Sequence, residues 1–193
     1  MPRDATETKR RLMKAAVDEF ATYGLAGARI DRIAETAAAN KRSIYMHFGT
    51  KEELFDQVVA DSMIKLAQSI TFDDGGLVGY AADLFERLEQ WPHIRRLYLW
   101  AGLERDQPVD AEVQQYRKRV AAIEAAQEAG QVRADIPAPE LMAMVISLAI
   151  SWDTATRSLK VLQPENRRET SADHKAAVVS AVTELVRPRT QPG

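Results

Sequence analysis

The 193-residue sequence contains no cysteine. This absence excludes disulfides, thiolate metal sites and cysteine nucleophiles, and it is typical of proteins of the reducing cytoplasm. The histidines, His47, His93 and His174, do not form the Glu-x-x-His or His-Glu-x-x-His spacings of helical metal sites. Gly-x-Ser-x-Gly, P-loop and dinucleotide-binding glycine patterns are lacking as well. We therefore predict no catalytic residue, no metal site and no cofactor, and an all-helical enzyme is only a remote alternative.

Long hydrophobic runs are also lacking. The longest near-continuous apolar run, Leu141 to Trp152, is far shorter than the roughly 20 residues that a membrane helix needs. The N-terminal residues do not contain the apolar region of a signal peptide. The sequence therefore predicts a cytoplasmic protein without a membrane span, and its 46% apolar residues suffice for a substantial core.

The net charge of −2 is small, which argues against a protein that coats nucleic acid along its whole surface. The charge is distributed unevenly, however. Up to Glu52 the chain holds ten Lys and Arg against seven Asp and Glu, a formal charge of +3, so the remainder carries −5. A basic N-terminal segment on an acidic body is the asymmetry of a local DNA-binding surface, although a solvated charged face gives the same pattern.

Residues 28 to 55 carry a helix–turn–helix pattern. Apolar residues recur at helical spacing in its first part, and this predicts a short helix with one buried face, formed by Ile30, Ile33, Ala34 and Ala37. Asn40 is a suitable N-cap for a second helix, in which Ile44 and Phe48 lie four residues apart as core anchors. Gly49 ends this helix, and Thr50 with Glu53 forms a capping box for the next one.

The remaining side chains of the second helix are polar, basic or aromatic, as a major-groove reader requires. A lysine in the first turn of the following helix is unfavourable to the helix dipole, so Lys51 indicates an anionic partner such as a DNA phosphate. With Tyr45 and His47 it is a candidate for backbone contacts, which position a protein without reading sequence. Arg42, Ser43 and Met46 are then the candidate base readers.

The run IDRIAETAAANKRSIYMHFGTKEEL resembles the N-terminal DNA-binding domain of the tetracycline-repressor (TetR) family of bacterial regulators. The resemblance covers about residues 8 to 60; beyond them it is one of length and helical architecture only. It implies DNA contacts by Arg29, Lys41, Arg42, Ser43, Tyr45, Met46, His47 and Lys51.

The sequence departs from the family pattern in three ways. Ala28 and Arg29 stand where the family commonly has Thr, so a cap hydroxyl and a phosphate contact are missing. Ala38 replaces the usual Gly of the turn, and in a left-handed conformation an alanine costs about 1 kcal/mol. The Lys41-Arg42 pair is more basic than usual. The first and third departures suggest that this protein prefers an operator sequence different from those of other family members.

The sequence predicts an all-α protein of two domains. Residues 1–52 form an N-terminal three-helix DNA-binding head, and residues 53–193 form a C-terminal helical body for ligand binding and dimerisation. The first helix is expected from Asp4, capped with Glu7, to Tyr23-Gly24. A long helix expected at Lys51–Ile70 belongs to both head and body, so it could transmit a conformational change between them. The other helices are expected at Leu77–Gln90, His93–Arg105, Ala111–Ala129, Pro139–Leu162 and Ser171–Val186.

The helix expected at Pro139–Leu162 is apolar nearly all round over its first half, so both of its sides need cover. We predict that one side faces its own domain and the other a second copy, as in a two-fold four-helix interface. The last helix would contribute Ala176, Val178, Val179, Val182, Leu185 and Val186. The alternative is a central helix within a monomer.

All three tryptophans and three of the five tyrosines follow residue 76. Aromatic and Met side chains on several helices could line an apolar pocket or could be core. The candidate ligand-binding residues are Phe85, Tyr98, Trp100, Tyr116, Met142 and Trp152. The family resemblance implies release of DNA when a small, often hydrophobic molecule binds the body.

The function predicted from the sequence is therefore that of a ligand-responsive regulator, a repressor that binds a palindromic double-stranded DNA operator as a homodimer. A small apolar or aromatic effector would release it. The alternatives are a DNA-binding protein that is constitutive or controlled by a protein partner, and an activator, because the chain does not encode where its operator lies.

Overall fold

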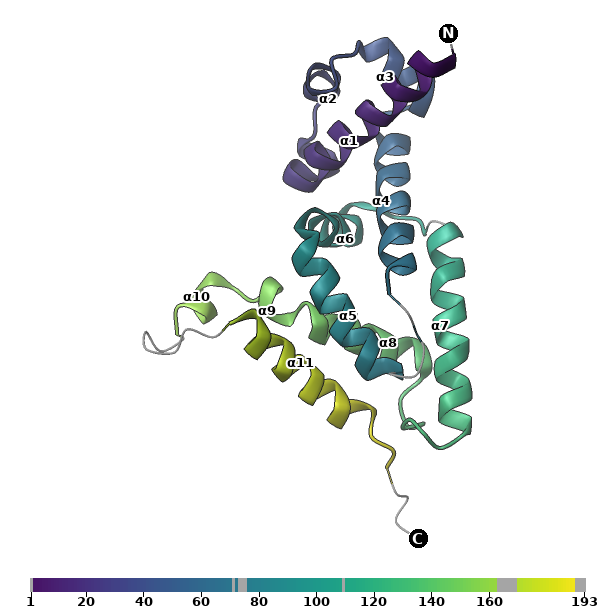
Figure 1. The fold of residues 1–193 in the computed structure, drawn as a ribbon, viewed down its shortest axis with the longest axis vertical. Coiled ribbons are helices and arrows are strands. Elements are labelled where there is room, and N and C mark those ends of the chain that lie inside the picture. Colours follow the sequence, from purple (N-terminus) through teal and green to yellow (C-terminus); the bar gives the residue numbers. More distant parts are fainter. Residues whose placement is uncertain (1, 71, 73–75, 109, 163–169, 190–193) are drawn as a thin grey trace. The chain divides into compact units, whose positions relative to one another are not determined.

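The computed structural model describes residues 2–70, 72, 76–108, 110–162 and 170–189 (Figure 1). Within these ranges all regular structure is helical and no strand occurs, as predicted. None of the described helices combines the length and apolarity that crossing a bilayer requires. The helices are α1 (Pro2–Gly27), α2 (Ile30–Thr36), α3 (Lys41–Phe48), α4 (Lys51–Gln68), α5 (Gly76–Gln90), α6 (Pro92–Glu104), α7 (Asp110–Glu128), α8 (Ala138–Ala149), α9 (Ser151–Thr154), α10 (Arg157–Lys160) and α11 (Ser171–Val186).

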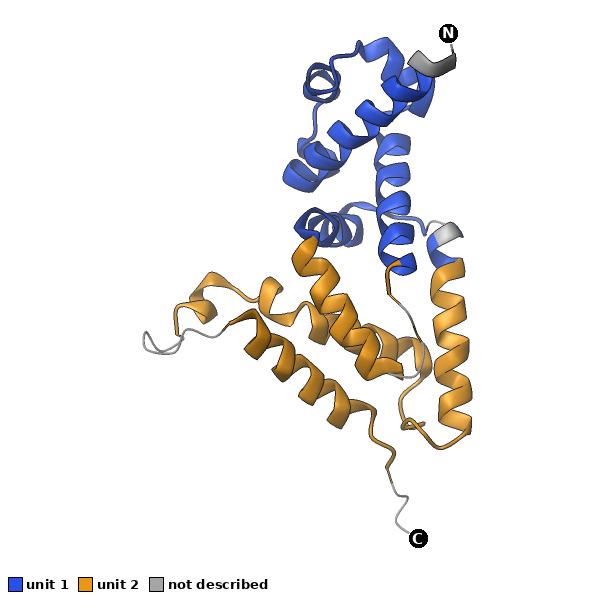
Figure 2. Cartoon of the chain, viewed as in Figure 1, with its two compact units in different colours: residues 1–68, 91–113 blue, residues 69–90, 114–193 orange. Residues whose placement is uncertain are grey.

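The chain forms two compact units (Figure 2). Unit 1 comprises residues 1–68 and 91–113, so it holds the helix–turn–helix segment together with α4 and α6. Unit 2 comprises residues 69–90 and 114–193. The boundary expected between residues 52 and 53 falls within unit 1, at the start of α4.

The core of unit 1 is built on α1, which packs against α2, α4 and α6. Leu12, Ala16 and Phe20 of α1 are fully buried, as their spacing predicts. The Phe20 ring meets that of Phe55 on α4 edge to face, with 5.1 Å between ring centres. The apolar stripe predicted for α4 is confirmed, and its buried residues are Leu54, Phe55, Val58, Val59, Ser62, Met63 and Leu66.

The start of α1 differs from the prediction, whereas the stop predicted at Tyr23-Gly24 coincides with a break in the helix. The helix begins at Pro2 rather than at a cap formed by Asp4, and Glu7 instead pairs with Arg10 at 2.6 Å. At Gly24 the backbone leaves the helical region (φ 67°), but the helix resumes and continues to Gly27. Tertiary contacts explain this kink, because Glu104 of α6 accepts hydrogen bonds from the backbone N–H groups of Leu25 (2.5 Å) and Ala26 (3.1 Å).

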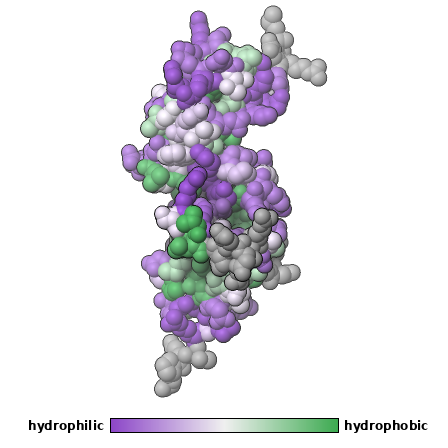
Figure 3. Space-filling model, turned by 90° about the vertical axis from the view of Figure 1, so that its left-hand side faces the viewer, coloured by the Kyte–Doolittle hydropathy of each residue, from purple (hydrophilic) through white to green (hydrophobic). Residues whose placement is uncertain are grey.

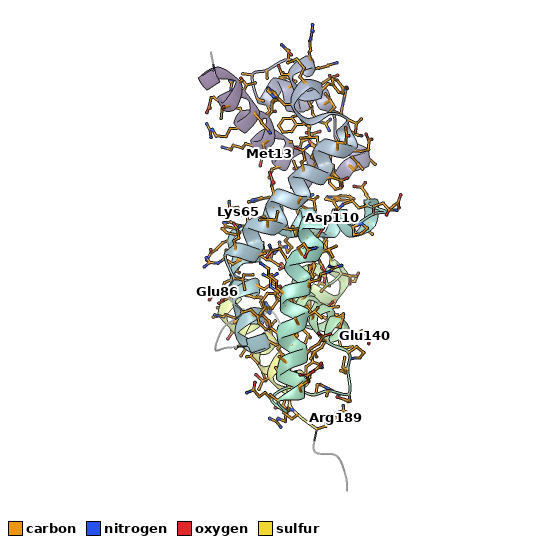
Figure 4. The ribbon with its side chains drawn as sticks, turned by 90° about the vertical axis from the view of Figure 1, so that its right-hand side faces the viewer. Met13, Lys65, Glu86, Asp110, Glu140 and Arg189 are labelled. Carbon is orange, nitrogen blue, oxygen red and sulfur yellow. The ribbon has the colours of Figure 1, made fainter. Side chains whose placement is uncertain are left out.

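In unit 2, α5 packs against α8 and α11. Leu141, Val145 and Ala149 form the buried face of α8. Polar contacts at the edge add to this packing, since Lys175 of α11 donates to Glu86 of α5 at 2.5 Å (Glu86 is labelled in Figure 4).

The prediction of a single helix over Pro139–Leu162 is wrong. The structure has three shorter helices there, because α8 ends at Ala149 and Ile150 departs from helical geometry (φ −104°, ψ 4°). The hydroxyl of Thr154 bonds back to the carbonyl of Ile150 at 3.0 Å, and the extended Thr156 then caps α10 by accepting from the N–H of Leu159. Serine and threonine hydroxyls compete with helical hydrogen bonds in this way, which hydrophobic periodicity does not reveal.

Part of the interface predicted on α11 is also corrected. Val178 and Val182 are buried in the core of unit 2, so they cannot cover a second copy. The reason is that they lie four residues apart on the side of α11 that packs against α5 and α8. Ala176 is exposed, and Val179, Leu185 and Val186 are half-buried.

Candidate DNA-binding site

The second helix of the helix–turn–helix, α3, is fixed by its own sequence. Asn40 caps it by accepting a hydrogen bond from the N–H of Ser43 at 2.8 Å, as predicted. Ile44 and Phe48 are buried, and Gly49 ends the helix with φ 79°. These contacts hold one side of α3 in unit 1 and leave its other side to solvent.

The solvent side of α3 carries the predicted DNA-contacting residues. Tyr45 is 54% exposed and Met46 is 71% exposed, while Arg42 is exposed and His47 is half-buried. Two large apolar or aromatic side chains on the surface, next to basic ones, are suited to contact base edges and sugars. The surface of the helix–turn–helix segment is mostly hydrophilic in Figure 3.

Two of these residues have intramolecular partners. Lys41 forms an ion pair with Asp31 of α2. The hydroxyl of Ser43 donates to Oδ1 of Asn40 at 3.0 Å. A phosphate must therefore compete with Asp31 for Lys41, and a base must compete with the cap for Ser43. Of the residues predicted to contact DNA, Arg42, Tyr45 and Met46 are thus the most accessible on α3.

The start of the following helix is as the sequence predicts. Thr50 and Glu53 form both hydrogen bonds of the capping box, at 2.7 and 3.1 Å. Lys51 is half-buried, and its ammonium group donates to the carbonyl oxygen of Ala28 at 3.5 Å. This contact supplies one partner for a first-turn lysine and directs its charge toward the start of α2.

A buried carboxylate near Arg29 was not found from the sequence. Glu19 of α1 is only 8% exposed, and it accepts hydrogen bonds from the backbone N–H of Arg29 (2.7 Å) and from Nε of Arg32 (2.9 Å). Hydrogen bonding to Glu19 raises the pKa of Arg32. Arg29 is the N-cap of α2 and makes no side-chain cap, and Glu19 satisfies the N–H of Arg29 itself, so a carboxylate of α1 anchors the start of α2. The side chain of Arg29 is exposed and stays a candidate phosphate contact.

The turn between α2 and α3 is left-handed at Ala38, with φ 47°. The N–H of Ala38 donates to the carbonyl of Glu35 at 3.0 Å and that of Ala39 to Ala34 at 2.9 Å, which closes the end of α2. An alanine in this conformation costs about 1 kcal/mol. The turn that joins α2 to α3 therefore keeps Ala38 in a conformation that alanine itself disfavours.

The six candidate ligand-binding residues fall in both units. Tyr98 lines a cavity of about 540 Å³ in unit 1, and Trp100 packs against Gly24, where a Cβ atom would lie 2.8 Å from its ring. In unit 2, Phe85 and Met142 are buried in the core, Tyr116 is half-buried on α7, and Trp152 stacks on His174 with 4.8 Å between ring centres. The structure does not gather these residues around one pocket within a single unit.

Comparisons with known proteins agree with this geometry. Residues 12–58 match the model of the bacterial regulatory proteins of the tetR family, and residues 76–183 match that of the tetracyclin repressor-like C-terminal domain. The chain is 40% identical to the HTH-type transcriptional repressor SCO4008 of Streptomyces coelicolor over 162 residues, which are 82% of this chain and 84% of that one.

Solved structures show the same fold. The putative transcriptional regulator SCO4942 from Streptomyces coelicolor is 27% identical, with a TM-score of 0.81 over 93% of this chain and 98% of that chain. A TetR family transcription regulator from Marinobacter aquaeolei is 16% identical, with a TM-score of 0.74 over 98% and 100% of the two chains.

Proposed function

The chain belongs to the tetR family of bacterial regulatory proteins, and from this premise we propose that it is a repressor that binds a palindromic operator as a homodimer and releases it when a small apolar or aromatic molecule binds. It is a DNA-binding transcriptional regulator rather than an enzyme. Since bacterial operators lie in the cytoplasm, the proposal places the protein there.

One observation carries the DNA-binding part of the proposal: the face of α3 opposite Ile44 and Phe48 presents Arg42, Tyr45 and Met46 to solvent. A helix inserted in the major groove reads base edges with such side chains, and arginine pairs with guanine through two hydrogen bonds. Lys41 and His47 lie on the same helix, and with Lys51 and Arg29 of the same unit they are suited to phosphates.

The homodimer is proposed from the exposed side of α8. Ala143, Met144, Ser147 and Leu148 line a shallow apolar groove together with Leu185 of α11. A water-soluble helix needs cover for such a side, and the face of unit 2 drawn in Figure 3 carries hydrophobic surface. A second copy related by a two-fold axis would cover it and would present two α3 helices to successive major grooves, about 34 Å apart.

Binding to the DNA that flanks the gene of this protein, measured by fluorescence anisotropy at fixed salt, tests the proposed reader. We expect Arg42→Ala to weaken specific binding by about 1–3 kcal/mol, roughly five- to 150-fold. Arg117→Ala, at an exposed position of α7 outside unit 1, is the matched control and should bind like the wild type. Equal affinity of wild type and Arg42→Ala would show that α3 is not the reader.

A further inference from the structure

Met46 is the most exposed large hydrophobic side chain of the helix–turn–helix segment, at 71%. Single apolar residues are common on protein surfaces, so the position of this one decides what it contributes. Met46 lies two residues from Ile44 and two residues from Phe48, the buried anchors of α3. Since each residue turns an α-helix by about 100°, Met46 projects from the side of α3 opposite the core.

Arg42 projects from the same side, because it precedes Met46 by one helical turn. The Cβ atoms of such neighbours are about 5–6 Å apart. Two other predicted contacts are held to the side: Lys41 is drawn toward α2 by its ion pair, and the ring of His47 meets that of Phe48 edge to face. A groove that receives α3 with its exposed side first therefore brings Arg42 and Met46 closest to the base edges.

The chemistry of Met46 restricts which base it can recognise. Its thioether donates no hydrogen bond and is only a weak acceptor. The nearby hydroxyl of Ser43 donates to Asn40, so it does not supply the missing donor. Among the base edges of the major groove, thymine alone presents a methyl group, whereas the other recognition groups are hydrogen-bond donors and acceptors. An apolar side chain at this place therefore discriminates in favour of thymine.

We propose that Met46 is a specificity-determining residue, which packs its side chain against the 5-methyl group of a thymine in each half of the operator. Arg42 stands one turn away, and successive bases are about 3.4 Å apart, so this thymine lies within about three base pairs of a guanine that Arg42 reads. The inference rests on the proposed function, which it extends by naming two bases of the recognised sequence.

Removal of the methyl group from the DNA tests the contact. The full chain first selects an operator from a random-sequence duplex library, and each thymine of that operator is then replaced by deoxyuridine, which lacks only the methyl group. Burial of one such group corresponds to about 0.8 kcal/mol, so we expect one substitution to weaken binding about fourfold and its repetition in both half-sites about 16-fold. Fluorescence anisotropy at fixed salt measures these affinities. If no deoxyuridine weakens binding, the proposal is overturned.

Variants of the protein assign the contact to one side chain. Met46→Ala should bind the thymine and deoxyuridine operators equally, and Met46→Leu, with an apolar side chain of similar size, should retain most of the preference for thymine. Because Met46 is exposed, neither substitution removes a core contact. Leu103→Ala is the matched control, since Leu103 is 78% exposed on α6, and it should keep the fourfold preference. A preference that survives in Met46→Ala would overturn the proposal.

Repeating the selection with two variants tests the predicted spacing of the bases. We expect Arg42→Ala to lose the preference for guanine at one position of each half-site, and Met46→Ala to lose the preference for thymine at another. The two positions should lie within about three base pairs of each other, because the two side chains are neighbours on one helix. Positions farther apart, or loss of a base other than thymine in Met46→Ala, would contradict the assignment.

The two proposals fail in different ways. A library from which the wild type enriches no sequence would contradict operator binding itself, and the role of Met46 with it. An enriched operator whose affinity no deoxyuridine changes would contradict only the role of Met46, even if Met46→Ala binds it weakly, because the side chain would then contact the DNA backbone. An operator whose affinity depends on one thymine methyl group in the wild type, but not in Met46→Ala, would support both.

Discussion

Oδ1 of Asn40 accepts two hydrogen bonds from Ser43, one from its backbone N–H at 2.8 Å and one from its hydroxyl at 3.0 Å. The same amide oxygen therefore starts α3 and fixes the rotamer of the serine that the sequence predicts as a base reader. Stability of the helix and presentation of its predicted DNA-facing side therefore both depend on the Asn40 side chain.

Asn40→Ala should lower the free energy of unfolding by about 1 kcal/mol, because it removes the N-cap of α3. Urea denaturation measures this loss. Ser43→Ala is the control, since it deletes the hydroxyl but keeps the backbone hydrogen bond, and it should be less destabilising. Equal losses in the two variants would mean that the hydroxyl, rather than the cap, holds the start of α3.

Asp31→Asn should strengthen DNA binding severalfold and steepen its dependence on salt. The exposed carboxylate of Asp31 pairs with Lys41, so its removal frees a cation for a phosphate. Anisotropy titrations at several salt concentrations give both quantities. Glu35→Gln changes the charge of α2 by the same amount at another exposed position. An equal gain in Glu35→Gln would attribute the effect to net charge alone.

Ala38→Gly should stabilise unit 1 by up to about 1 kcal/mol, because glycine adopts the left-handed conformation at φ 47° without a Cβ penalty. Ala39→Gly, at the next residue and without a positive φ, should be neutral or destabilising. The midpoints of chemical denaturation distinguish the two. A loss of stability in Ala38→Gly would contradict the strain assigned to this turn.

Met144→Lys should convert a dimer to a monomer, because the 41% exposed Met144 lies in the apolar groove of α8. A lysine there places a charge in the centre of the proposed interface. Sedimentation equilibrium measures the mass. Leu159→Lys introduces the same charge at an exposed apolar residue outside the groove and should leave the dimer intact. A monomeric wild type would contradict the proposed interface directly.

Asp135→Asn should destabilise unit 2 near neutral pH, and the difference from wild type should disappear in acid. Hydrogen bonds from Arg133 lower the pKa of Asp135 to about 2. A depressed folded-state pKa stabilises the fold fully above the unfolded value near 4, and this stabilisation is lost as the pH falls toward 2. Melting temperatures from pH 7 down to pH 2 follow the change.

The buried Arg133 also donates to the carbonyl of Leu185 at 3.1 Å, which ties the loop before α8 to the end of α11. Asp61→Asn, at an exposed carboxylate of α4, is the control and should differ little from wild type at any pH. A difference between Asp135→Asn and wild type that is as large at pH 2 as at pH 7 would show that the interaction does not depend on the carboxylate charge.

The features that the sequence determined are local in the chain. The Asn40 cap joins residues three apart, as does the Thr50–Glu53 capping box, and the buried stripe of α4 repeats every three to four residues. Such patterns depend on the geometry of a single helix, which is the same in every protein. For this reason the exposed side of α3 could be identified before its packing was known.

Only the tertiary structure decided which groups meet across long stretches of sequence. Glu19 accepts a hydrogen bond from the N–H of Arg29, ten residues away, and Glu104 accepts one from the N–H of Leu25, 79 residues away. Tertiary packing likewise selected the buried side of α8 and placed Arg105 beside both Asp56 and Glu112. No periodicity encodes these contacts, because they arise from helices whose mutual arrangement is a property of the whole fold.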